Sequence, residues 1–216
     1  MENKAPLVID VVSDVVCPWC YLGKRRLERA IALVPATDIV VRWHPFQLDP
    51  TIPPGGLDRT EYMKAKFGDL SRVDAIHDRL IAFGKEEGVD YRFDAIKRAP
   101  NTLDAHRLVH WAPVDRQDAL VEALFRANFT EGRDVGDPAV LAEIGSQHGL
   151  DREATLARLA TDEDLGAIRG AIAEAQRIGV TGVPCFIVGG RYAVMGAEQP
   201  QVIASAIEKA ASEAAA

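Results

Sequence analysis

The sequence predicts an α/β fold in which an all-α insertion divides one small mixed sheet. Short runs rich in β-branched residues occur near both ends of the chain, whereas the interval from about residue 58 to 178 has almost none. Amphipathic helical patterns fill that interval instead. The expected order is therefore βαβ, then several helices, then ββα. At 216 residues the chain has the length of one large domain, or of one domain with a substantial insertion.

The first unit is strand, helix, strand, with strands expected at residues 7–12 and 38–44. Pro18 suits the first helical turn, because its missing N–H removes no hydrogen bond there, and this places Cys17 at the N-cap. Pro35 ends the helix. The apolar face of the helix consists of Leu27, Ala30, Ile31 and Val34. This spacing predicts two parallel strands joined by a right-handed crossover.

The middle of the chain reads as a helical block. Asp137 and Pro138 have the residue types of an N-cap followed by a first helical position. Two apolar stripes have helical spacing, one formed by Val73, Ile76, His77, Leu80 and Ile81 and the other by Ala119, Leu120, Ala123, Leu124 and Ala127. Helix C-caps are expected near Gly132, Gly149 and Gly179.

The β pattern returns near the C-terminus. Strands at residues 185–188 and 191–195 flank Gly189–Gly190, a two-residue hairpin signal, and a helix at 200–211 follows. These patterns predict a sheet domain formed by residues 1–57 and 179–216, with residues 58–178 inserted as a helical domain.

Charge and composition restrict the partners. With 25 Lys and Arg against 32 Asp and Glu, the net charge of −7 argues against a nucleic-acid partner. No apolar run approaches the roughly 18 residues of a membrane span, and the N-terminus does not resemble a signal peptide. Three cysteines are too few for a secreted disulfide framework. We therefore expect a cytoplasmic protein without a membrane partner, and the sequence leaves a homodimer open.

Two of the three cysteines stand at the predicted start of the first helix, in the order Cys-Pro-Trp-Cys. Cys17, at the N-cap, would face free backbone N–H groups and the positive end of the helix dipole, which favour a thiolate. Cys20 lies almost one turn further on and is more shielded. Disulfide exchange requires an attacking thiolate and a second thiol to resolve the mixed disulfide. Cys17 is therefore predicted as the nucleophile and Cys20 as the resolving thiol.

A metal site is the main alternative at this point. Structural zinc needs four ligands, usually a second Cys-x-x-Cys or a close pair of histidines. The five histidines are dispersed, although His106 and His110 are four residues apart. A non-catalytic module that binds metal through Cys17, Cys20, Cys185 and one histidine stays open, as do cysteines that only fill the core.

Several segments resemble a known family. Residues 13–24, which contain the cysteine pair, and Gly182-Val183-Pro184 before a strand resemble the DsbA family of thioredoxin-fold oxidoreductases, and within it the FrnE-like branch. Further similar segments are residues 43–48, 101–108 and 124–129. The family fold is a thioredoxin domain interrupted by a helical one.

The resemblance implies roles for particular residues. Cys17 and Cys20 take the positions of the catalytic pair, and Pro184 that of a cis-proline opposite it. The Val183 backbone would then pair with an extended substrate. Trp19, Val183 and Pro184 are the expected substrate-binding residues, and no metal ligand is assigned.

The resemblance also implies an activity, thiol–disulfide exchange with protein or small-molecule disulfides. A cysteine pair with a reduction potential of about −120 mV would be held reduced by a cytosolic glutathione pool at about −220 mV. We therefore expect a reductase or isomerase. No resident cofactor is expected, and glutathione is a candidate thiol donor.

An alternative within the superfamily is a glutathione-dependent enzyme similar to 2-hydroxychromene-2-carboxylate isomerase or kappa-class glutathione transferase. These relatives usually carry serine at the nucleophile position and lack the second cysteine. The chain departs from the family pattern at Cys185, where a non-thiol residue is commoner; it is expected either to fill the core or to bring a third sulfur near the pair.

Three other features are not assigned to the catalytic set. Asp14 is expected as a turn or cap group. His106 is expected as a partly buried structural residue. Lys24-Arg25-Arg26 is expected to form a solvated face.

Overall fold

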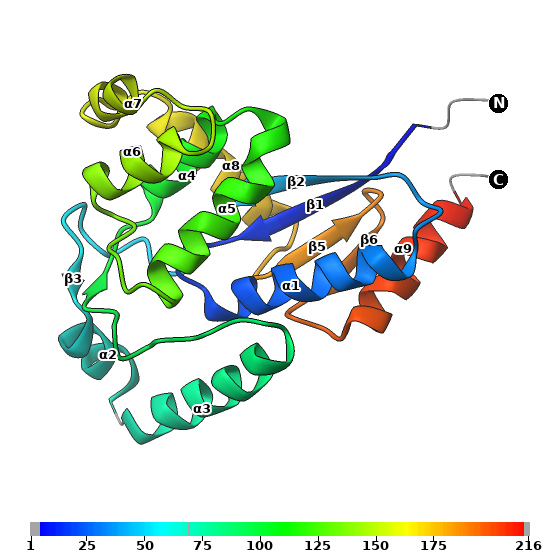
Figure 1. Ribbon diagram of the computed structural model, residues 1–216, viewed down its shortest axis with the longest axis horizontal. Helices are drawn as coiled ribbons and strands as arrows, with labels where there is room; N and C mark the ends of the chain where they lie inside the picture. Colours follow the sequence, from blue (N-terminus) through cyan, green and yellow to red (C-terminus); the bar gives the residue numbers. More distant parts are fainter. Residues whose placement is uncertain (1–4, 69, 214–216) are drawn as a thin grey trace.

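The computed structural model describes residues 5–68 and 70–213, so parts of the predicted segments at residues 1–4, 69 and 214–216 lie outside the described residues. The main sheet has the strand order β2-β1-β5-β6 (Figure 1). Its strands are β1 (Leu7–Ser13), β2 (Ile39–Pro45), β5 (Cys185–Val188) and β6 (Tyr192–Met195). β1 and β2 are parallel, whereas the other neighbours are antiparallel, so the predicted mixed sheet is confirmed.

Two helices cover one face of this sheet. α1 (Pro18–Leu33) begins with Cys17 as N-cap and Pro18 at its first position, as predicted, and ends two residues before Pro35. α9 (Pro200–Glu213) packs beside it. The core between these helices and the sheet contains buried apolar side chains, among them Ile9, Val11, Leu27, Ala30, Phe186, Val188, Ile203 and Ile207.

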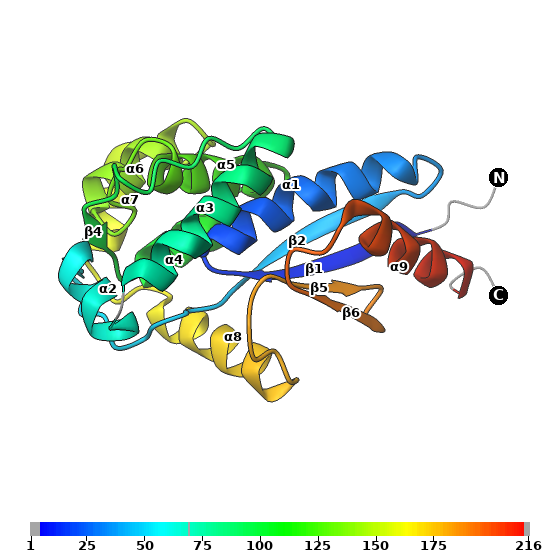
Figure 2. The same ribbon diagram turned by 90° about the horizontal axis from the view of Figure 1, so that it is seen from below.

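The opposite face of the sheet is covered by α8 (Leu165–Arg177), and Figure 2 shows α1 and α8 on opposite sides of the strands. Because side chains alternate along a strand, Phe186 faces α1 while Cys185 faces the other way. The small core on this second face consists of Val12, Phe46, Ala175, Val180 and Cys185.

The predicted helical block is also present, at the carboxyl ends of β1 and β2 (Figure 1). Its helices before α8 are α2 (Arg59–Phe67), α3 (Leu70–Glu86), α4 (Leu103–Trp111), α5 (Val114–Phe129), α6 (Pro138–Ser146) and α7 (Arg152–Leu159). Asp137 caps α6 by accepting from the N–H groups of Ala139 and Val140, as its sequence position predicts. One feature was not predicted: β3 (Leu57–Asp58) pairs with β4 (Arg98–Ala99) as a short antiparallel ladder.

The helical block and the sheet domain share a core. Tyr21 of α1 stacks on Phe125 of α5, with ring centroids 5.1 Å apart. The Tyr91 hydroxyl donates to the Pro18 carbonyl at 2.6 Å. The first turns of α1 are therefore buried against the insertion.

The C-terminal hairpin differs from its prediction by one residue. Gly189 and Gly190 both have positive φ and form the tight turn, closed by the Arg191 N–H donating to Val188 O at 3.1 Å. The strand register, however, pairs Val188 with Tyr192. Arg191 is thus an extra residue between turn and strand, so the prediction that β6 begins at Arg191 was wrong.

Candidate functional site

The cysteine pair lies where β1 leads into α1. The Cys20 N–H donates to the Cys17 carbonyl at 3.0 Å, which forms the first turn of the helix. Both residues are free thiols, and both are buried, Cys17 being 3% exposed and Cys20 1%. Cys17 lines a cavity that Cys20 does not reach. This difference in access is the one expected for an attacking and a resolving thiol.

The loop before β5 meets the pair, as the resemblance implies. The Val183–Pro184 peptide bond is cis, and the Cys17 Sγ donates to the Val183 carbonyl at 3.7 Å. Gly23 of α1 allows this approach, because a Cβ added there would lie 2.8 Å from Pro184 Cγ. The fold therefore brings together residues more than 160 positions apart in the chain.

The surroundings of Cys20 keep it protonated. Burial raises the pKa of the Cys20 thiol well above its ordinary value, and the adjacent Cys17 sulfur raises it further. The Ser13 hydroxyl and the Asp14 backbone N–H lower the pKa by smaller amounts. Cys20 therefore holds its proton at neutral pH until the pair reacts.

A cavity of about 360 Å³ opens in front of Cys17. Trp19 and Val183, two of the predicted substrate-binding residues, line it together with Cys17. Trp19 also packs against Phe83, with ring centroids 6.4 Å apart. Much of the remaining wall is apolar and includes Ile52, Val73, Ile76, Leu80, Phe93 and Phe129.

The sequence did not identify this wall. Most of the added residues come from α2, α3 and the segments that flank them, which are distant from the cysteines in the chain. The apolar stripe of α3 was visible, but a stripe does not say which element it faces. Only the packing of α3 against α1 shows that part of this stripe borders the site.

The expectation of a solvated Lys24-Arg25-Arg26 face was wrong. Lys24 is 2% exposed, and its ammonium lies 3.1 Å from Asp118 and within ion-pair distance of Glu28 and Glu122. Arg25 is half-buried and also pairs with Glu122. Asp118 and Glu122 belong to α5, which therefore covers the face of α1 that the sequence alone leaves open.

Arg26, the third residue of that face, is buried against the other side of the insertion. Its Nε donates to Glu87 at 3.2 Å, and both side chains are nearly inaccessible, 5% and 2% exposed. Arg29 binds the second oxygen of the same carboxylate at 2.8 Å. Glu87 follows α3, so this pair ties α1 to the helical block.

Asp14 and His106 have structural contacts. Asp14 is buried and accepts from the Leu48 N–H at 2.8 Å, while its other oxygen lies 3.4 Å from the His106 ring. The Nε2 of His106 is 2.8 Å from the Phe46 carbonyl. Together these groups fasten the chain after β2 to the loop that precedes Cys17.

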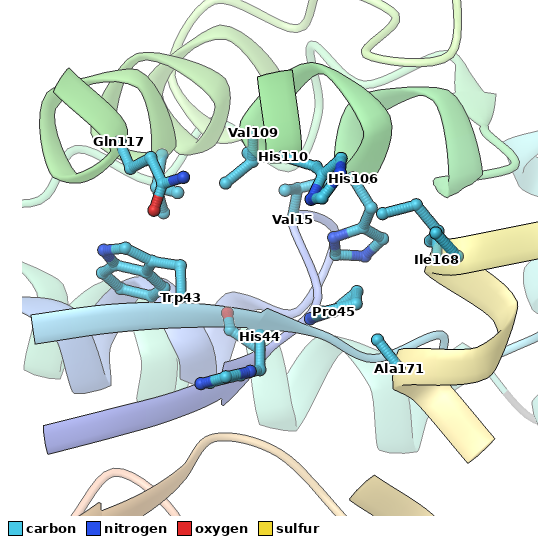
Figure 3. A pocket seen from close by; sticks show the side chains of 13 residues that line it. Val15, Trp43, His44, Pro45, His106, Val109, His110, Gln117, Ile168 and Ala171 are labelled. Atoms are coloured by element: carbon cyan, nitrogen blue, oxygen red, sulfur yellow. The ribbon is translucent and has the colours of Figure 1, made fainter. Parts of the chain in front are cut away.

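His106 also borders a second cavity, of about 250 Å³, shown in Figure 3. There it points from α4 toward β2, near Pro45, with Trp43 further along the same strand. Ile168 and Ala171 of α8 close another side. The lining residues include no cysteine, so this cavity is separate from the thiol site.

Cys185 is buried in the core on the α8 face of the sheet and does not line the cavity in front of Cys17. Burial raises the pKa of its thiol. Among the described residues, which include every cysteine and histidine, no three His, Cys, Asp or Glu side chains are grouped so that they could hold a metal ion.

Comparisons with known proteins show the family of this chain. The DSBA-like thioredoxin domain family matches residues 8–208. The probable DsbA oxidoreductase SCO1869 of Streptomyces coelicolor is 34% identical in sequence, with a TM-score of 0.88 over 96% of this chain and 91% of its own.

Two further structures show likeness of fold alone. One is a 2-hydroxychromene-2-carboxylate isomerase, with a TM-score of 0.72, 18% identity and coverage of 96% of this chain and 98% of its own. The other is the cytosolic disulfide reductase DsbM of Pseudomonas aeruginosa with GSH. Its TM-score is 0.62 and its sequence identity 22%, over 96% of this chain and 97% of its own. The FrnE-like branch stays a prediction. The residues matched by the family contain the whole site, and the chain belongs to the family of DSBA-like thioredoxin domains, as a thioredoxin-fold oxidoreductase of the DsbA type.

Proposed function

We propose that this protein is a cytoplasmic thiol–disulfide reductase or isomerase with Cys17 as nucleophile and Cys20 as resolving thiol. The observation that supports this most is the position of the Cys17 sulfur, at the N-cap of α1, beside the Val183 carbonyl and on the wall of a cavity. Cys20 is buried one turn behind it, which supports its role as the thiol that attacks the same sulfur.

The reaction proceeds in two exchanges. The Cys17 thiolate attacks one sulfur of a substrate disulfide, forming a mixed disulfide and releasing one substrate thiolate. Cys20 then loses its proton and attacks the Cys17 sulfur, which forms the Cys17–Cys20 disulfide and releases the second thiolate. The substrate gains two electrons, the protein loses two, and the protons from the cysteines end on the released thiols. In an isomerase, a different cysteine thiolate of the substrate instead attacks the substrate sulfur of the mixed disulfide, which forms a new substrate disulfide and releases Cys17 as a thiolate.

The compartment sets the net direction of electron transfer between the protein and its substrate. A reducing cytosol returns the pair to its dithiol form, so the reduced protein meets substrate disulfides. No described helix has the length and apolar character to cross a membrane. The fold likeness to a cytosolic disulfide reductase supports a reductase in the cytosol, and glutathione is then a candidate donor of the returning electrons. Substrates would be protein or small-molecule disulfides.

The competing proposal is a glutathione-dependent isomerase, which the likeness to 2-hydroxychromene-2-carboxylate isomerase favours. Such chemistry has no use for a buried second thiol behind the nucleophile. A Cys20→Ser variant separates a disulfide reductase from the glutathione-dependent enzyme, because it abolishes catalytic disulfide reduction and leaves a reaction that needs one sulfur intact.

Insulin reduction and refolding of scrambled ribonuclease test the proposed function. Wild type should be active in at least one assay, Cys17→Ser inactive in both, and Cys185→Ser equal to wild type, because Cys185 lies outside the cavity. Wild-type activity no greater than that of Cys17→Ser would refute the proposal.

A further inference from the structure

We infer that the cavity in front of Cys17 binds disulfides that carry a carboxylate on an apolar body, with the carboxylate held by the Arg59 guanidinium. This inference rests on the proposed function and adds a class of substrate and a residue that selects it. Arg59 is the first residue of α2 and lines the same cavity as Cys17.

Arg59 differs from the other arginines of comparable burial. Every other arginine that is buried or half-buried among the described residues has a carboxylate within ion-pair distance; these are Arg25, Arg26, Arg107, Arg133 and Arg158. Arg59 has no carboxylate partner among the described residues, and its side chain is partly withdrawn from water. Burying part of a charge without a partner is unfavourable, so a bound anion would improve its surroundings.

The other charges on the cavity wall are already engaged. Asp49 accepts from the Tyr62 hydroxyl at 2.9 Å and pairs with Lys66 at 3.4 Å. Arg98 donates to the Gly55 carbonyl and lies 4.0 Å from Asp134.

Asp14 is held by the Leu48 N–H and lies 3.4 Å from His106. Burial lowers the pKa of His77, the histidine of this cavity, and Arg59 lowers it further. His77 is therefore neutral at neutral pH. Apart from the Cys17 thiolate of the reaction itself, Arg59 is the charge on the described cavity wall that has no counter-charge.

The rest of the wall suits an apolar body with one more polar contact. Side chains such as Ile76, Phe93 and Phe129 provide apolar area. Thr102 is nearly completely buried and lines the cavity, and its hydroxyl has no hydrogen-bond partner among the described residues. A buried hydroxyl without a partner is unfavourable, and a substrate oxygen or nitrogen can satisfy it.

The volume of about 360 Å³ fits one substituent of a small disulfide rather than a folded protein surface. With its carboxylate on Arg59 and its apolar part against α3, the bound group would present its sulfur toward Cys17 on the same wall. The two exchanges then proceed as above, and the bound half leaves as a thiol.

Rapid-mixing kinetics with two aromatic disulfides test this inference. The anionic probe is 5,5′-dithiobis(2-nitrobenzoate), which has one carboxylate on each half, and the neutral probe is 4,4′-dithiodipyridine. For Arg59→Gln we expect the rate with the anionic probe to fall about tenfold relative to wild type, and the rate with the neutral probe to stay within about twofold. Arg59→Lys keeps the charge but loses the planar guanidinium. Its rate with the anionic probe should therefore lie between the rates of wild type and Arg59→Gln.

Arg98→Gln is the matched control, because Arg98 lines the same cavity but is already engaged. It should leave the ratio of the two rates within about twofold of wild type. An Arg59→Gln ratio equal to that of wild type, or equal losses with both probes, overturns the inference while the proposed function stands. If wild type reacts with both probes no faster than Cys17→Ser, the proposed function itself fails.

Discussion

At the scale of single residues, the two sulfurs of the site differ in their surroundings more than in their position along the helix. Cys17 borders the cavity and contacts the Val183 carbonyl, whereas Cys20 is enclosed by protein. The raised pKa of Cys20 has burial as its largest cause. Because burial is the largest cause, the pKa of Cys20 returns to its ordinary value when the protein unfolds.

This coupling predicts how stability depends on pH. The unfolded chain releases the Cys20 proton at about pH 8.5, whereas the folded chain retains it. Above that pH the folded state therefore binds more protons than the unfolded state. The contribution of Cys20 to the free energy of unfolding is therefore complete below about pH 8.5 and is lost as pH rises toward its folded pKa. One pH unit above the unfolded value, the loss is about 1.4 kcal/mol.

Urea unfolding of the reduced protein at about pH 7 and about pH 9.5 measures this effect. Wild type should lose more stability between the two pH values than Cys20→Ala does. The raised pKa values of Cys185 and Tyr21 act in both proteins and cancel in the comparison. Equal losses would contradict a protonated Cys20 in the folded state.

At the scale of elements, the site depends on how closely α1 approaches the loop before β5. Gly23 lies one turn past Cys20 on the face that meets Pro184 and Phe186. Glycine inside a helix is normally unfavourable compared with alanine, by about 1 kcal/mol. Here the missing side chain is what lets Pro184 reach the start of the helix.

Gly23→Ala should therefore destabilise the protein, because the new Cβ would lie 2.8 Å from Pro184 and 3.1 Å from Phe186. We expect a net loss of about 1 to 3 kcal/mol, since the overpacking exceeds the helix-propensity gain. Reduction of a small neutral disulfide should also slow, because Pro184 and Val183 shift away from Cys17.

Gly170→Ala is the control for this change, as it lies inside α8 with nothing within 4 Å of the added Cβ. It should raise stability by up to about 1 kcal/mol and leave the reaction rate unchanged. Chemical denaturation measures the free energy of unfolding of both variants, and rapid-mixing kinetics measures their reaction rates. Stabilisation by Gly23→Ala would show that the close approach is not needed.

At the scale of the whole molecule, the insertion and the sheet domain are joined by apolar packing and by buried charge. The Arg26–Glu87 pair lies between α1 and the end of α3, and Arg29 binds the same carboxylate. A buried pair adds little compared with apolar packing, but removing one partner leaves the other charge uncompensated. The two parts are expected to unfold together for this reason.

Glu87→Gln should lower the free energy of unfolding by about 3 kcal/mol, since Arg26 then stays buried without a counter-charge. The comparable change Glu174→Gln removes an ion pair with Arg177 on the exposed surface of α8 and should have no measurable effect. Thermal denaturation followed by circular dichroism tests both. Equal behaviour of the two variants would mean that the Arg26–Glu87 pair is solvated in solution.

The features that the sequence predicted well are those that depend on local geometry. Pro18 and Cys17 mark a helix start because a proline without an N–H fits only there, and Asp137 caps α6 by the same local rule. The hairpin turn follows from two adjacent glycines, but its register does not, because strand pairing depends on the neighbouring strand β1 as well as on the turn.

The sequence by itself determined the fold class, the cysteine pair and, through family resemblance, the proline that faces it, because each leaves a pattern within a few adjacent residues. Only the tertiary structure decided that Lys24 and Arg26 are buried, that Cys185 lies in the core on the α8 face, and that α2 and α3 bring Arg59 to the cavity in front of Cys17. Burial and charge pairing depend on what packs against a residue from distant parts of the chain, and that information is absent from its own neighbourhood in the sequence.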